Sequence, residues 1–135
     1  MIGCLAGSMS AKDMVLAPGI IELDAPLVLS GDGLLVMGAP SGTTLKASSR
    51  FEGPALIVAR GLKHLTVERL KIDGNRAIHG RPIGIAPDDQ AFRDFYDRNG
   101  ILVDNCQGVI LRDLELRNVA HFPILVSRSE HVRIQ

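Results

Sequence analysis

This sequence predicts an all-β fold of stacked parallel turns, a parallel β-helix, and three observations predict it. A pattern of aliphatic residues repeats along the chain, each repeat unit reads as three short strands with alternating apolar positions, and only short turns rich in Gly, Asn and Asp separate those strands. Strand triplets cannot bury an apolar face alone, whereas stacking them in register buries a continuous core. No unit contains a helical segment between its strands, so a βαβ sheet fits poorly.

The repeat is clearest in residues 56–134. Residues 100–111 overlay residues 123–134 at an offset of 23 (101 to 124), which aligns Ile101 with Ile124, Val103 with Val126, Val109 with Val132, and Leu111 with Ile134. Residues 56–73 overlay the same pattern at an offset of 44 (57 to 101), with matching apolar residues at Ile57, Ala59, Leu65, Val67, Leu70 and Ile72. The 21 extra residues (44 minus 23) predict an insertion over residues 74–99.

Less regular apolar stretches before the repeat supply the early turns. They span residues 14–16, 20–23, 26–30, 34–37 and 43–46. Together with the repeat they predict about four turns in a single domain over residues 1–135, a normal length for one core.

The composition excludes several partners. The 15 basic and 15 acidic residues cancel, aromatic residues are 4% and Trp is absent, so neither a polyanion such as DNA nor stacked single-stranded nucleic acid is expected. No apolar run approaches the ~18 residues of a membrane span. Cys4 and Cys106 lie far apart without a CxxC or a nearby His pair, which predicts no zinc site and leaves a disulfide open.

Particular motifs give this pattern a family resemblance. The pattern Gly-Ile-x-Val, then Val-x-Leu-x-Asp-x-x-Leu, with Leu70-Lys-Ile-Asp-Gly-Asn-Arg76 before the insertion, resembles the pectate-lyase-like superfamily of secreted, right-handed parallel β-helices. The resemblance covers roughly residues 14–135. It implies a polysaccharide partner and an extracellular or periplasmic location. Relatives usually open with a capping helix, and none precedes Met14, while the last turn stops at Gln135. We therefore expect a fragment, or a homo-oligomer through uncapped ends.

In such relatives, substrate lies along the outer face of the first strand of each turn. Here those strands are 56–59, 100–104 and 123–127, whose outward row is apolar: Val58, Leu102 and Leu125. Within the insertion, Asp88 to Arg98 predicts a short helix with three aromatic residues on one face, namely Phe92, Phe95 and Tyr96. We expect this face to pack over the outward row; a substrate lid and a self-association surface are the alternatives.

The resemblance also implies candidate site residues. Asp97 and His121 are the candidate catalytic residues, because both come just before first-position strands. The candidate substrate-binding residues surround them: Arg76, His79, Tyr96, Asn99, Asp104 and Ser127. Glycoside hydrolysis needs two placed carboxyl groups, and the aspartate pair of polygalacturonase-like relatives is missing one turn later. The Asp-Pro-His-Glu segment of alginate-epimerase-like relatives is also missing, at residues 125–128.

No cofactor is predicted. The aspartates of the insertion are a conceivable Ca²⁺ site, but the ion needs about six converging oxygens and helical spacing separates these side chains, so i,i+4 pairs with Arg93 and Arg98 are favoured. Asp73 is expected to fix a turn through an Asx hydrogen bond, and His64 and His131 to be exposed surface residues.

Two functions remain open from the sequence. One is part of a secreted carbohydrate-active enzyme of the lyase, hydrolase or epimerase type. The other is a non-catalytic β-helix module for polysaccharide binding, adhesion or self-association. The first depends on analogy of fold, and the second on the missing carboxylate and the apolar outward row.

Overall fold

The computed structural model describes residues 13–75, 99–119 and 122–135, and within these ranges the chain is all-β. No helix occurs in the described residues, and accordingly none that could cross a membrane. The strands are β1 (Asp13–Val15), β2 (Gly19–Leu23), β3 (Leu27–Leu29), β4 (Leu35–Met37), β5 (Thr43–Ala47), β6 (Ala55–Arg60), β7 (Lys63–Asp73), β8 (Asn99–Asp104), β9 (Gln107–Arg117), β10 (Ile124–Ser127) and β11 (Glu130–Ile134).

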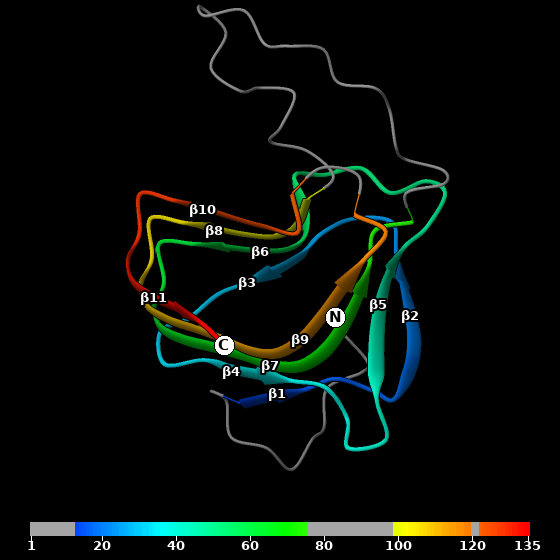
Figure 1. Cartoon of the computed structure of the whole chain (residues 1–135), viewed down its shortest axis with the longest axis horizontal. Coiled ribbons are helices and arrows are strands. Elements are labelled where there is room, and N and C mark those ends of the chain that lie inside the picture. The colour runs from blue at the N-terminus through cyan, green and yellow to red at the C-terminus, as the bar shows by residue number, and fades with distance from the viewer. Residues whose placement is uncertain (1–12, 76–98, 120–121) are drawn as a thin grey trace, which may run out of the picture.

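All described strand pairs are parallel and form two sheets. One sheet has the order β10-β8-β6-β3, and the other has the order β1-β4-β7-β5-β2, with β9 beside β7 and β11 beside β9. In Figure 1 the first sheet lies along one side of the core, β1, β4, β7 and β9 along the bottom, and β2 and β5 along the right-hand side. The parallel pairing confirms the predicted all-β class and is consistent with a β-helix-like arrangement.

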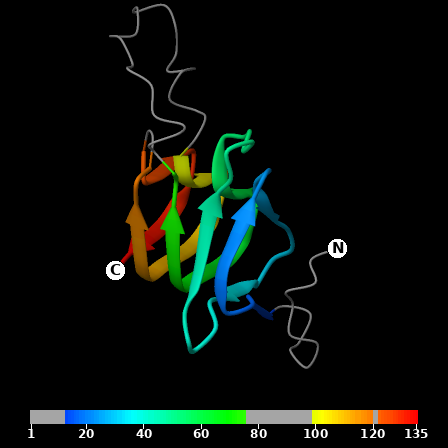
Figure 2. The same ribbon diagram turned by 90° about the vertical axis from the view of Figure 1, so that its right-hand side faces the viewer.

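Two long strands join the second and third strand of a turn into one element. β7 bends at Arg69 and β9 bends at Asp113, where the backbone φ is 57° and 53°. The first half of β7 pairs with β4, and its second half pairs with β5. Figure 2 shows the second halves of β9 and β7 side by side with β5 and β2. A single left-handed residue therefore turns the strand from one face of the molecule to the next.

The strand register confirms the repeat that the sequence predicts. Ile101 is paired with Ile124, and Val109 with Val132, across the offset of 23. The offset of 44 pairs Ile57 with Ile101. The five other predicted pairs at this offset are also observed: Ala59 with Val103, Leu65 with Val109, Val67 with Leu111, Leu70 with Leu114, and Ile72 with Leu116.

The core follows from this register, because alternate residues of each strand face inward. Ile57, Val67 and Val109 are 0% exposed and belong to one continuous apolar cluster with residues from nearly every strand. Val58 and Leu102 belong to a second cluster with Ala55, against which Leu125 packs. The predicted outward row thus lies apart from the main core.

The start of β8 is packed too closely for a side chain at its second residue. A Cβ atom at Gly100 would lie 2.4 Å from the carbonyl oxygen of Pro123, while the Gly100 and Ile101 amides donate to the carbonyls of Phe122 and Pro123 at 2.9 Å. Asn99 and Gly100, which follow the expected insertion helix, are the first two residues of β8. The helix expected over Asp88 to Arg98, with its aromatic face, lies outside the described residues.

Candidate functional site

A polar row crosses the four-stranded sheet where its strands end. Arg60 on β6 pairs in register with Asp104 on β8, and Asp104 pairs with Ser127 on β10. Because Ala59 and Val103 belong to the main core, the Arg60 and Asp104 side chains project from the outer face, beside the apolar row of Val58 and Leu102, and Ser127 is in register with Asp104. Two of the three, Asp104 and Ser127, are residues that the sequence predicted for substrate binding.

Arg128 completes the row from the turn after β10. Its Nε donates to Oδ1 of Asp104 at 3.0 Å and its Nη2 donates to Oδ2 at 2.8 Å, a two-pronged ion pair with a fixed orientation. Nε of Arg60 lies 3.9 Å from Oδ2 of the same carboxylate. Arg128 has a φ of 50°, so a left-handed backbone conformation brings its side chain back over the strand before it.

These contacts determine the charge of Asp104. The hydrogen bond from Arg128 lowers the pKa of the Asp104 carboxyl below its usual value, assisted by the positive charges of Arg128 and Arg60 and by a hydrogen bond from Ser127, and opposed by desolvation. Asp104 is therefore a carboxylate at neutral pH. The side chain is only 16% exposed, whereas Arg60 and Arg128 are 59% and 73% exposed. Two largely exposed guanidinium groups thus flank one shielded carboxylate.

A cavity of about 310 Å³ opens at this row, lined by Arg60, Leu102, Asp104, Ser127 and Arg128. The apolar row continues across the sheet to Val28, which pairs with Val58 and is 64% exposed. The outer face therefore offers aliphatic surface next to charged and hydroxyl groups.

Two other predicted residues have structural partners. Asn99 is fully buried at the opposite end of β8, and its Oδ1 accepts a hydrogen bond from the Phe122 amide at 2.9 Å. Asp73 accepts a hydrogen bond from the Asn75 amide at 2.8 Å, which confirms the predicted Asx turn. Asn99 thus links two turns of the chain at a distance from the Asp104 cavity.

The remaining candidates lie outside the described residues: Asp97, His121, Arg76, His79 and Tyr96. The predicted exposure of His64 and His131 is confirmed. Two residues of the observed site, Arg60 and Arg128, were missed. The offset of 44 that aligns Ile57 with Ile101 also aligns Arg60 with Asp104. The repeat could therefore have predicted that Arg60 lies beside Asp104.

No group of His, Cys, Asp and Glu side chains suited to a metal ion occurs in the described ranges. Cys106 is a buried free thiol whose Sγ lies 3.5 Å from the carbonyl oxygen of Ala59. Cys4, the other cysteine of the sequence, lies outside those ranges.

Comparison with known proteins adds no relative: no family model matches the chain, and no curated protein or solved structure matches it significantly.

Proposed function

We propose that the chain is a segment of a right-handed parallel β-helix that binds an acidic polysaccharide along the outer face of the β3-β6-β8-β10 sheet. The observation that carries the proposal is the row of Arg60, Asp104, Ser127 and Arg128, which lines a cavity beside an apolar strip. A sugar polymer presents hydroxyl groups and apolar C–H faces together, and a uronic acid polymer adds carboxylates. Guanidinium groups suit those carboxylates by geometry and charge.

The spacing of the row supports a polymeric ligand. Neighbouring parallel strands lie ~4.8 Å apart, so equivalent side chains on β6, β8 and β10 recur at that interval. Successive units of an extended sugar chain recur at a comparable length. A chain running across the strands would therefore meet an equivalent position at each strand, with the apolar row of Val58 and Leu102 alongside.

Between the two functions that the sequence left open, the Asp104 environment favours binding. A general acid must hold a proton near the working pH, which requires a raised carboxyl pKa. The pKa of Asp104 is lowered instead, by Arg128 first of all. Asp104 is therefore suited to orienting the arginines, and bond cleavage would need other residues.

The test is binding of fluorescently labelled oligogalacturonate, with a neutral glucan of equal length as the comparison ligand. We expect oligogalacturonate to bind more tightly, and Arg60→Gln to weaken its binding about tenfold, the effect of losing one charged hydrogen-bonding group. Arg50→Gln is the matched control, because Arg50 is an exposed arginine paired with Asp24 elsewhere. Equal binding of the two ligands, or an unchanged affinity in Arg60→Gln, would reject the proposal.

The same incubations report on catalysis. Release of reducing ends with the absorbance of an unsaturated uronate would indicate a lyase, and reducing ends alone would indicate a hydrolase. Turnover of either kind would contradict the assignment of a purely binding role to this chain.

A further inference from the structure

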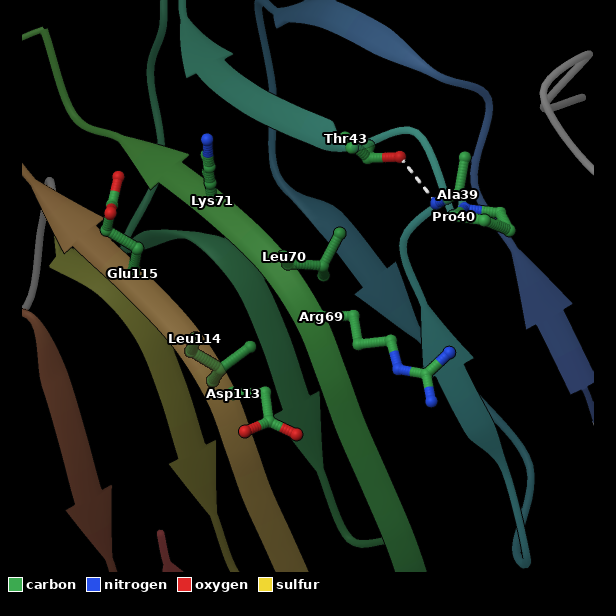
Figure 3. Close-up of a pocket in the computed structure, with 10 residues that line it drawn as sticks. Ala39, Pro40, Thr43, Arg69, Leu70, Lys71, Asp113, Leu114 and Glu115 are labelled. Carbon is green, nitrogen blue, oxygen red and sulfur yellow. Dashed lines mark hydrogen bonds between the residues drawn. The ribbon is translucent and has the colours of Figure 1, made fainter.

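A second groove lies on another face of the molecule, at the bends of β7 and β9. It measures about 510 Å³ and is lined by Ala39, Pro40, Gly42, Thr43, Arg69, Leu70, Lys71, Asp113, Leu114 and Glu115. Figure 3 shows three consecutive side chains of β7 and three of β9 along it, with the loop at Ala39 and Pro40 opposite. None of these residues belongs to the Asp104 site or to the sheet that carries it.

The groove exists because one turn of the chain takes a longer path. β7 and β9 pass from one face to the next through single left-handed residues, Arg69 and Asp113. Between β4 and β5 the same step takes the five residues 38–42, which leave the strand and return. Room therefore opens between this loop and the bend of β7. The partly buried Leu114 lies at its base, beside Leu70, which is only 2% exposed.

Hydrogen bonds hold the loop in place. The Ala39 amide donates to Oγ1 of Thr43 at 2.8 Å, and that hydroxyl donates to the carbonyl of Ala17 at 2.9 Å. The Gly38 amide donates to the Glu68 carbonyl at 3.2 Å, and a Cβ atom at Gly38 would lie 2.1 Å from the Arg69 carbonyl oxygen. The wall is thus preformed, which lowers the entropy lost when a ligand binds.

The charges along the groove do not neutralise one another across the two strands. Arg69 pairs with Glu68 on its own strand at 3.4 Å, and Glu115 pairs with Arg117 on its own. Lys71 and Glu115 are in register but form no salt bridge. Within the described residues, neither Lys71 nor Asp113 has an ion-pair partner, and both are exposed. β7 thus offers a free cation at Lys71, and β9 offers a free carboxylate at Asp113, two residues from the register partner of Lys71.

We propose that this groove binds an acidic sugar unit, as a second site distinct from the Asp104 row. The sugar carboxylate lies at Lys71 and Arg69, neighbouring hydroxyls donate to Asp113 and Glu115, and a C–H face rests on the partly exposed Leu114 side chain. Each groove feature then has a complementary ligand group. Binding here does not require the first site, because the two lie on different sheets.

The test is a nuclear magnetic resonance titration of the ¹⁵N-labelled chain with sodium galacturonate, and with galactose as its uncharged counterpart. We expect galacturonate to shift the amide signals of residues 38–43, 69–71 and 113–115, and galactose to shift them far less. Lys71→Gln should weaken the galacturonate effect about fivefold. Lys63→Gln, which removes an exposed lysine from the start of the same strand, should leave it unchanged.

Two further variants complete the design. Asp113→Asn should weaken binding in the groove because the amide loses a charged acceptor, whereas Arg60→Gln should leave the groove signals unaffected. Failure at the first site is then distinguishable from failure at the groove. The proposal is overturned if galacturonate leaves these amides unshifted, if galactose shifts them equally, or if Lys71→Gln binds as the unmodified chain does.

Discussion

At the scale of single residues, Asp104 shows how one carboxylate organises two arginines. Arg128 holds both carboxylate oxygens, and Arg60 approaches one of them at 3.9 Å. The carboxylate lies close to the sheet and the guanidinium groups face solvent. A negative charge that is itself shielded therefore positions two accessible cations, and the row can be selective for anions without an overall positive chain.

This arrangement predicts a pH-dependent effect of Asp104→Asn on stability. At neutral pH the substitution removes the ion pair, and we expect it to lower the free energy of unfolding by at most about 1 kcal/mol, because both arginines are largely exposed. The folded-state pKa of Asp104 is lowered from its ordinary value of 3.8. Its contribution is therefore complete above that value and is lost as pH falls through the lowered folded-state pKa.

Urea unfolding of both proteins at pH 7 and at successively more acidic pH measures this effect. The difference between them should shrink toward zero in acid. Glu130→Gln is the control, since Glu130 is an exposed carboxylate on β11. A difference between Asp104→Asn and the unmodified chain that stays constant into strong acid would show that the ion pair is not its cause.

At the scale of elements, the strands were more predictable than the site. The register of β6 to β11 followed from the aliphatic repeat, because a one-residue slip would turn every inward side chain outward. The offset of 44 also implies that Arg60 lies beside Asp104, although Arg60 was not predicted as a site residue. The position of Arg128 did not follow, because it depends on a left-handed backbone at a residue type that rarely adopts one.

The groove at the bends was equally inaccessible to sequence reasoning. Leu70 and Leu114 were recognised as repeating core positions, but nothing in their pattern showed that residues 38–42 would leave the strand and open space above them. A pocket formed by unequal turn lengths depends on how far a loop departs from its neighbours. The aliphatic repeat does not contain that information.

The corner at the second residue of β7, β9 and β11 offers a test of backbone strain in these elements. His64, Gly108 and His131 occupy matching positions there, with φ values of 59°, 70° and 55°. A Cβ atom at Gly108 would lie 3.2 Å from Nδ1 of His64. We expect Gly108→Ala to destabilise the fold by about 1–2 kcal/mol, because it adds both a left-handed side chain and a close contact.

The reverse substitution at the same corner is the matched control. His131→Gly removes a strained side chain from an exposed position and should change the free energy of unfolding by less than about 1 kcal/mol. Thermal and urea unfolding of the two variants compare them directly. Equal losses in both would indicate that the corner is insensitive to backbone conformation.

At the scale of the whole molecule, charges alternate across the sheet that runs through β2, β5, β7 and β9. Glu22 is in register with Lys46, Lys46 with Asp73, and Asp73 with Arg117. Residues of opposite charge are therefore in register on each neighbouring pair of these strands. Figure 2 shows the four strands side by side. The chain has 15 basic and 15 acidic residues, and in this row they alternate from strand to strand. This alternation favours the observed register over a shifted one.

Reversing one charge in the series tests its contribution. Lys46→Glu places an acid between Glu22 and Asp73, and like charges directly opposite each other on neighbouring strands are destabilising. No salt bridge joins Lys46 to either neighbour among the described residues, so the attraction acts through solvent and its loss should be modest. We expect Lys46→Glu to unfold at a free energy about 0.5–1 kcal/mol below Lys46→Gln at low salt. The gap should close near 1 M salt, where the screening length falls to ~3 Å, and a gap that persists there would point to lost side-chain packing instead.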